Sequence, residues 1–264
     1  MFATRAKIDY LAFSARGGTF PYLRDAVGYD LAQLVLEHTL HSLGVPLSAL
    51  PAGAIGRGRG GYQFAWNMGT GARAFAGHPT SPPYVEFTGS ALDSLREHVS
   101  DPEIAALTAD TASRLDLCTD ISTDTRPSEF VASMASKRAY ARSQHVSNSG
   151  ETQYIGSPSS DRMCRVYRYA EPHPRAAFLR VEVQLRSLYA RHYATQTAIR
   201  GAYNALLDAT ATYSFTSPLW RQVDARTTVA RTYPDDARNA RLLRFWYKTC
   251  VPVQNKLREA GLLE

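Results

Sequence analysis

Apolar and polar side chains alternate along many short segments of the first 186 residues, whereas the rest of the chain follows a helical period. Alternation of this kind is typical of strands with one buried face. We expect strands over residues 6–14, 62–68, 72–77, 84–89, 114–121, 152–156, 163–170 and 178–186. Helices are expected over residues 25–43, 90–99 and 128–142, and again from about residue 187 onward.

The expected elements occur in the same order twice. Each half reads strand, helix and three strands, and each begins with an apolar-Asp-apolar triplet, Ile8-Asp9-Tyr10 or Leu115-Asp116-Leu117. Short connections between strands favour antiparallel pairing with helices on one face. The predicted fold class is α+β: a largely antiparallel sheet built from two β-α-β-β-β-like halves, followed by C-terminal helices. The core is expected over 1–186, with halves at about 1–100 and 110–186, and a helical region over 187–264 is expected to pack on it.

Composition adds a weak preference for polyanionic partners. The chain has 30 Lys and Arg against 24 Asp and Glu, which gives a net charge of +6. Basic proteins attract nucleic acid, but an excess of this size is also common in proteins that bind none. The three cysteines are far apart and form no CxxC pair, so neither a zinc site nor a disulfide framework is indicated. With no signal-peptide pattern and no apolar run long enough to span a bilayer, we expect a cytoplasmic protein without a membrane partner.

Three of the expected strands carry chemically active residues at every second position. Residues i and i+2 of a strand share a face. Over 114–121 this face holds Arg114, Asp116, Cys118 and Asp120; over 178–186 it holds Arg180, Glu182, Gln184 and Arg186; over 163–170 it holds Met163, Arg165, Tyr167 and Tyr169. An ordinary half-buried strand with a solvated polar face shows the same alternation. If the three strands are neighbours, however, their carboxylates could bind a hard divalent cation beside a phenol and guanidinium groups.

The same segments resemble a known family. The run YIGSPSSDRMCRVYRYAE (154–171) is similar to the central motif of the Rep_trans family of rolling-circle replication initiators, which occur on plasmids, filamentous phages and integrative elements. RLDLCTDI (114–121) and LRVEVQLR (179–186) resemble two further motifs, and FWYKTCVPVQNKLREAGL (245–262) resembles the closing helix of the family. The resemblance implies an endonuclease and relaxase that nicks and religates one strand of origin DNA through a 5′-phosphotyrosine.

The resemblance also implies roles for individual residues. Tyr167 would be the nucleophile and Arg165 would assist at the phosphate. The metal, Mg²⁺ or Mn²⁺, would be held by Asp116 and Glu182, with Asp120 a weaker third ligand. Family members often have a lysine where this chain has Tyr169, so Tyr169 is retained as a second candidate nucleophile or a base-stacking side chain. The implied partners are origin DNA as a single strand or hairpin, a host helicase and a second copy of the chain.

Other features of the sequence leave alternatives open. The stretch GAIGRGRGG (53–61) contains GxGxxG but runs into a strand, which argues against a dinucleotide site. It is either a loop that follows a phosphate backbone or a hairpin turn. Candidate DNA contacts are Arg57, Arg59, Arg180 and Arg186. The histidines include no His-x-His pair, which disfavours the nicking enzymes that bind metal through closely spaced histidines. A non-catalytic protein that binds an origin or operator, as a repressor or accessory factor, is the alternative function.

Overall fold

The fold is built on one long antiparallel sheet. The computed structural model describes residues 6–15, 27–69, 71–122, 126–132, 142–147, 150–157, 159–170 and 177–211. Within these residues the first half contains β1 (Lys7–Ser14), α1 (Gly28–Ser42), a 3₁₀ turn (Leu47–Ala49), β2 (Gly53–Arg57), β3 (Phe64–Met68), β4 (Ala72–Ala76), β5 (Tyr84–Thr88), α2 (Gly89–Leu95) and α3 (Asp101–Thr108). The second half contains β6 (Ala112–Ser122), α4 (Pro127–Ala132), β7 (Arg142–Ser147), β8 (Gly150–Ile155), β9 (Arg162–Ala170), β10 (Ala177–Arg186) and α5 (Ser187–Ala211).

The order of the strands gives the sheet an approximate twofold symmetry. In the described part of the chain ten strands pair in the order β2-β3-β4-β5-β1-β6-β10-β9-β8-β7. From the edge to the centre, the first half has the order β2-β3-β4-β5-β1 and the second half has the matching order β7-β8-β9-β10-β6. Strands β1 and β6 pair antiparallel in the middle of the sheet. Tyr10 of β1 lies opposite Asp116 of β6, close to the symmetry axis. The predicted α+β class and the repeat of two halves are both confirmed.

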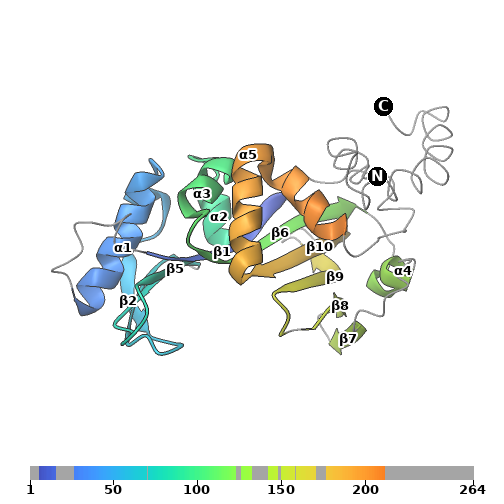
Figure 1. Ribbon diagram of the computed structural model, residues 1–264, viewed down its shortest axis with the longest axis horizontal. Helices are drawn as coiled ribbons and strands as arrows, with labels where there is room; N and C mark the ends of the chain where they lie inside the picture. Colours follow the sequence, from blue (N-terminus) through green and yellow to red (C-terminus); the bar gives the residue numbers. More distant parts are fainter. Residues whose placement is uncertain are drawn as a thin grey trace.

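Helices cover one face of this sheet because one face is apolar from strand to strand. Residues opposite each other in antiparallel strands point to the same side. One continuous row across β4, β5, β1, β6 and β10 consists of Ala72, Phe87, Leu11, Leu115 and Leu185, all of them buried. Helix α1 packs on β3 and β4, and α5 packs on β6 and β10 (Figure 1). The adjacent row, on the other side of the sheet, is polar and carries the candidate chemistry.

Each half has one strand more than the sequence pattern predicted. Strand β2 covers the first five residues of the glycine-rich stretch 53–61, and the remaining residues 58–61 belong to the turn to β3. Its glycines are required by close packing: a Cβ on Gly53 would lie 2.3 Å from Nε1 of Trp66, and one on Gly56 would lie 2.2 Å from Nδ2 of Asn67. The contact with β3, rather than strand propensity, defines β2, so propensity could not reveal it.

The expected helix over 128–142 is described only at its two ends. Residues 127–132 form α4, as expected, whereas Arg142 at the other end begins β7, and the residues between them lie outside the described ranges. Strand β7 is polar and forms the edge of the sheet, so it lacks the alternation by which buried strands are recognised. The expected helix over 90–99 is instead the shorter α2, and α3 then starts at a capping box formed by Ser100 and Glu103.

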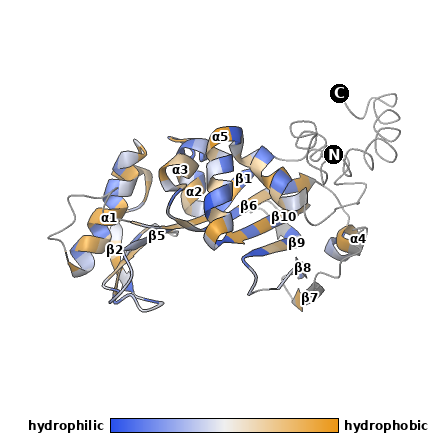
Figure 2. Ribbon diagram, in the orientation of Figure 1, coloured by the Kyte–Doolittle hydropathy of each residue, from blue (hydrophilic) through white to orange (hydrophobic). Residues whose placement is uncertain are grey.

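Figure 2 shows that apolar and polar residues are mixed within both the strands and the helices. Among the helices in the described ranges, none combines the length and apolar character needed to cross a membrane. The motif at 245–262 and most of the expected region 187–264 lie outside the described residues.

We predict that the apolar row is the main source of stability. Phe87 is a fully buried member of this row, so Phe87→Ala should lower the free energy of unfolding by about 3–5 kcal/mol through lost burial and a residual cavity. Ile55 on β2 is 65% exposed, and Ile55→Ala should change it by no more than about 0.5 kcal/mol. Urea unfolding followed by circular dichroism measures both. Equal losses for the two variants would contradict this assignment of the core.

Candidate active site

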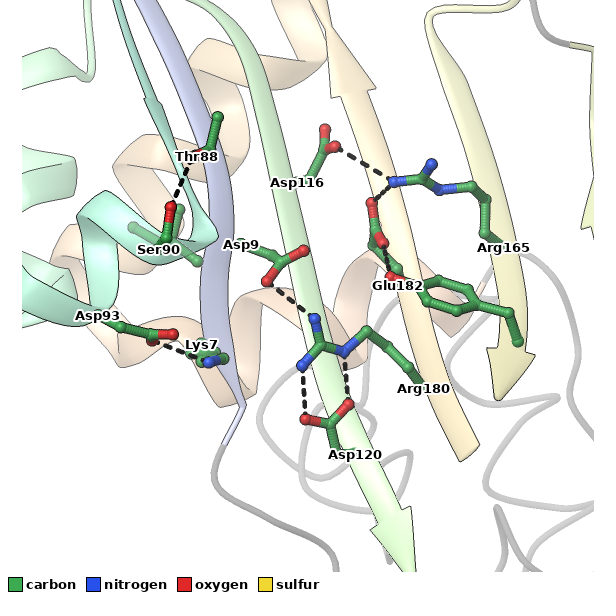
Figure 3. Close-up of polar contacts among 12 residues, drawn as sticks. Lys7, Asp9, Thr88, Ser90, Asp93, Asp116, Asp120, Arg165, Arg180 and Glu182 are labelled. Atoms are coloured by element: carbon green, nitrogen blue, oxygen red, sulfur yellow. Dashed lines mark hydrogen bonds and ion pairs between the residues drawn. The ribbon is translucent and has the colours of Figure 1, made fainter. Parts of the chain in front are cut away.

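The three polar strand faces singled out from the sequence lie side by side. Strand β10 pairs with β6 on one side and with β9 on the other. Glu182 therefore lies opposite Cys118 on β6 and opposite Arg165 on β9, while Arg180 lies between Asp120 and Tyr167. Figure 3 shows Asp116 and Glu182 pointing toward Arg165, and Asp120 pointing toward Arg180, across these strands. The sheet thus brings together the residues that the sequence predicted as nucleophile, phosphate contact and metal ligands.

Glu182 is the centre of the first cluster. Its side chain is fully buried, and Oε2 accepts a hydrogen bond of 2.8 Å from the hydroxyl of Tyr167. Oε1 is bound by Nη2 of Arg165, and the same nitrogen lies 3.8 Å from Oδ2 of Asp116. One guanidinium therefore bridges the two carboxylates that the family resemblance assigns to the metal.

Asp116 is held in place by its neighbours on the same face. Arg114 donates two hydrogen bonds to its carboxylate, of 3.0 Å from Nε and 2.6 Å from Nη2. Gln184 lies opposite Asp116 and makes a long contact of 3.5 Å to Oδ2, while Arg186 donates a 2.8 Å hydrogen bond to Gln184. These contacts fix the orientation of the Asp116 carboxylate, which is almost completely buried.

Arg180 organises a second cluster beside the first. It is buried and donates hydrogen bonds of 2.6 and 2.7 Å to Asp120 and one of 3.0 Å to Asp9. Asp9 was not among the predicted site residues, although its apolar-Asp-apolar context was noted. The register of β1 shifts between Ile8 and Tyr10, so Asp9 lies in an irregularity that strand alternation alone could not place.

Burial governs the protonation of the first cluster. It raises the pKa of the Tyr167 phenol above its ordinary value, and the charge of Glu182 raises it further. Burial also raises the pKa of Glu182, with the nearby charge of Asp116 adding to the effect. The phenol is therefore protonated at neutral pH, and its proton is already directed at a carboxylate. Within the described residues Nε of Arg165 is buried without a hydrogen-bond partner.

The donor set suits a small hard cation only in part. Asp116 and Glu182 converge on one nitrogen of Arg165, whereas Asp120 is turned to Arg180. Among the described residues no group of three or more acidic, histidine or cysteine side chains is arranged around a common point. Two carboxylates nevertheless fit Mg²⁺, which keeps several waters and takes its remaining ligands from substrate phosphates.

The other predicted site residues are distributed as follows. Arg57 and Arg59 belong to the first half of the sheet, at the end of β2 and in the turn after it, and do not reach the Glu182 cluster. Arg180, a candidate DNA contact, is instead enclosed by Asp9 and Asp120. The backbone of Tyr169 pairs with Phe178, but its side chain lies outside the described residues.

Comparison with known proteins bears on the architecture. No model of a known protein family matches the sequence, and no curated protein matches it. Among solved structures, the rolling circle replication initiator protein from Geobacillus stearothermophilus aligns over 80% of this chain and 86% of its own, with a TM-score of 0.59 and 18% identity. The two proteins share a fold. This likeness agrees with the resemblance read from the sequence, and at this identity it extends to the fold alone.

We predict that Arg180 is a structural cation. Arg180→Met removes the guanidinium that the partly buried Asp9 and the buried Asp120 share, and should cost about 3–5 kcal/mol of unfolding free energy near pH 7.5. Burial raises the pKa of Asp9 even with Arg180 present. A carboxyl group whose pKa is higher in the folded than in the unfolded state binds its proton more tightly when the protein is folded. The free energy of unfolding therefore falls as the pH rises through the range between the two pKa values. The loss caused by Arg180→Met should therefore shrink toward about pH 4.5.

Urea unfolding at the two pH values measures this difference. Arg57→Met is the matched control, because the exposed Arg57 has no hydrogen bond or ion pair with the described residues. It should change stability by no more than about 0.5 kcal/mol at either pH. A loss for Arg180→Met that is small at pH 7.5, or constant with pH, would show that the carboxylates do not depend on this cation.

Proposed function

We propose that the protein is a rolling-circle DNA replication initiator that nicks and religates one strand of origin DNA through a 5′-phosphotyrosine intermediate. The observation that carries the proposal is the contact between Tyr167 and Glu182. A phenol held 2.8 Å from a buried carboxylate, with Arg165 on the same carboxylate, is the arrangement of a nucleophile, a base and a phosphate ligand. The shared fold with a replication initiator supports the same reading.

Tyr167 is the proposed nucleophile. Its oxygen attacks the phosphorus of the scissile phosphodiester, and its proton passes to Oε2 of Glu182. The bond between phosphorus and Tyr167 forms as the bond to O3′ breaks, and the leaving O3′ takes up a proton. The 5′ end of the strand is then linked to the protein. Religation is the reverse reaction with a 3′-hydroxyl, and because the phosphodiester energy is retained it needs no nucleotide cofactor.

Arg165 is the proposed ligand for the reacting phosphate. Its guanidinium lies beside the phenol, with its central carbon 5.8 Å from the ring centroid, and its side chain is 28% exposed. The exposed part of the guanidinium can donate to a non-bridging oxygen while Nη2 keeps its contact with Glu182. Negative charge that develops on the phosphate is thereby stabilised in a site with little water, where such contacts are strongest.

Asp116 and Glu182 are the proposed ligands of Mg²⁺ or Mn²⁺. When bound, the ion would polarise the phosphate and neutralise its charge. Arg114 and Gln184 orient Asp116 for this role. Asp120 is the weaker candidate, since its two oxygens accept hydrogen bonds from Arg180. We also propose origin DNA, a host helicase and a second copy of the chain as partners of the protein.

We predict that Tyr167 alone forms the covalent link. With a labelled single strand carrying the origin sequence and Mn²⁺, wild type should give a protein–DNA adduct that survives denaturation. Tyr167→Phe should lose the adduct by at least about 10³-fold, because the variant keeps the ring but has no attacking oxygen. Tyr169→Phe is the matched control and should keep most of the adduct. If Tyr169→Phe abolishes it instead, the nucleophile is Tyr169; if no DNA yields an adduct, the protein only binds its site.

We also predict that cleavage requires a divalent ion bound by the carboxylates of Asp116 and Glu182. Asp116→Asn should raise the Mn²⁺ concentration needed for half-maximal cleavage by roughly 10-fold or more, because one charged ligand becomes neutral at nearly constant shape. Glu151→Gln, on β8, is a control that removes a carboxylate away from the cluster and should leave this concentration unchanged. Cleavage that persists in a metal chelator would overturn the ligand assignment.

A further inference from the structure

The twofold arrangement of the sheet gives every position of the Glu182 site a counterpart in the first half. Strand β5 corresponds to β10 and β4 to β9. Glu86 on β5 lies directly opposite Arg73 on β4, as Glu182 lies opposite Arg165. Phe75 lies two residues after Arg73 on β4, as Tyr167 lies two residues after Arg165 on β9, so Phe75 occupies the position that corresponds to Tyr167. The sequences Arg-Ala-Phe and Arg-Val-Tyr are thus the same structural motif in the two halves.

The first-half cluster repeats the contacts of the Glu182 site as well as its register. Glu86 is buried, with 1% of its side chain exposed. Its Oε2 accepts a hydrogen bond of 2.5 Å from the hydroxyl of Tyr10 and is also bound by Arg59, and Oε1 lies 3.4 Å from Nη1 of Arg73. A buried glutamate is again surrounded by a phenol and arginines. We call this group, Tyr10, Arg59, Arg73, Phe75 and Glu86, the twin site.

Two substitutions remove the parts that cleavage needs. Phe75 has no hydroxyl where Tyr167 has one, and it is buried under the guanidinium of Arg59, whose central carbon lies 4.9 Å from the ring centroid. Tyr10 occupies the position that corresponds to Asp116, so Glu86 lacks a carboxylate partner for a metal ion. The twin site therefore keeps the Tyr10 phenol, but it has no tyrosine at the position of Tyr167 and no pair of acidic ligands.

Positive charge, in contrast, is retained and increased. A cavity of about 310 Å³ opens beside the twin site and is lined by Arg57, Arg59, Asn67, Gly69, Arg73 and Phe75. Glu86 offsets one of the three arginine charges. Arg57 has no hydrogen bond or ion pair with the described residues, and the side chains of Arg59 and Arg73 are 53% and 40% exposed. The cavity therefore presents about two uncompensated positive charges and guanidinium donors, which suit a phosphate group.

We propose that the twin site is a second DNA-binding site, which holds a phosphodiester of the bound strand without cleaving it. The choice of DNA as ligand rests on the proposed function. Glu86 and Glu182 are separated by three steps between neighbouring strands, β5 to β1, β1 to β6 and β6 to β10. At about 4.8 Å a step this is roughly 14 Å across the sheet. Glu86 is also level with Arg114 of β6, whereas Glu182 faces Cys118, four residues further along that strand, which adds roughly 13 Å in the strand direction. The two glutamates are therefore roughly 20 Å apart, the length of about six nucleotides in a duplex. A strand bound at Tyr167 can therefore reach the twin site within a few nucleotides.

The test compares a short and a long single strand on the full-length protein. An oligonucleotide of about 4 nucleotides should occupy only the Tyr167 site, and one of about 30 nucleotides should reach both sites. Arg57→Ala should weaken binding of the long strand by roughly 3- to 10-fold and reduce the slope of log affinity against log salt by about 0.7, the value for one lost phosphate contact on a single strand. The double variant Arg57→Ala/Arg73→Ala should weaken it further.

Controls separate this role from folding and from catalysis. Arg57→Ala should unfold like wild type, because Arg57 has no partner to lose within the described residues. Arg200→Ala removes a charge from α5, which packs on the opposite face of the sheet, and should leave both affinity and salt slope unchanged. The yield of covalent adduct on saturating short strand should be the same for Arg200→Ala and wild type, because this charge lies away from both proposed sites.

Each outcome decides the proposal. Weaker binding of the long strand, with unchanged binding of the short strand, supports the twin site. This holds even if no adduct forms on any DNA, a result that would reject the nicking function but not the twin site. Long-strand affinity and salt slope that match those of Arg200→Ala overturn the twin site while leaving nicking at Tyr167 intact. Competition by inorganic phosphate at millimolar concentration, with no dependence on strand length, would also overturn it, since the cavity would then bind free phosphate rather than DNA.

Discussion

The pairing of buried carboxylates with arginines from neighbouring strands is the interaction on which the polar face depends. A carboxylate without solvent is strongly disfavoured unless a cation or several hydrogen-bond donors compensate it. Glu182 obtains this compensation from Arg165 and Asp120 obtains it from Arg180, in each case across one step of the sheet. The register of strand pairing therefore determines which charged side chains meet. A slip of one residue would turn the charged side chains of the shifted strand to the face that the helices cover.

Much of this arrangement could be predicted from the sequence because a strand has a period of two. The alternation over 114–121, 163–170 and 178–186 correctly placed Asp116, Glu182 and Tyr167 on common faces, and the repeated order of elements correctly indicated two similar halves. That the three strands are neighbours could not be obtained from periodicity. It follows from β10 lying between β6 and β9, which is a property of the whole sheet.

The features that were missed have tertiary causes. Strand β2 exists because two glycines allow it to pack against Trp66 and Asn67, and no local preference marks it. Asp9 reaches Arg180 from an irregular part of β1, where alternation fails. Glu86 appeared in the sequence as one polar residue in a short strand, and only the pairing of β5 with β4 and β1 shows that arginines and a phenol surround it.

The antiparallel meeting of β1 and β6 has the geometry of an interface between two identical subunits. Near Tyr10 and Asp116 each strand offers the other the same edge, so two separate copies of one half could pair here into a symmetric dimer with the same strand order. Such a dimer would carry two equal sites. Joined in one chain, the halves are free to diverge: the second has Tyr167 and a pair of buried carboxylates, whereas the first has Phe75 at the corresponding position and a single buried glutamate among arginines. Covalent linkage of the halves thus permits asymmetry within a symmetric sheet.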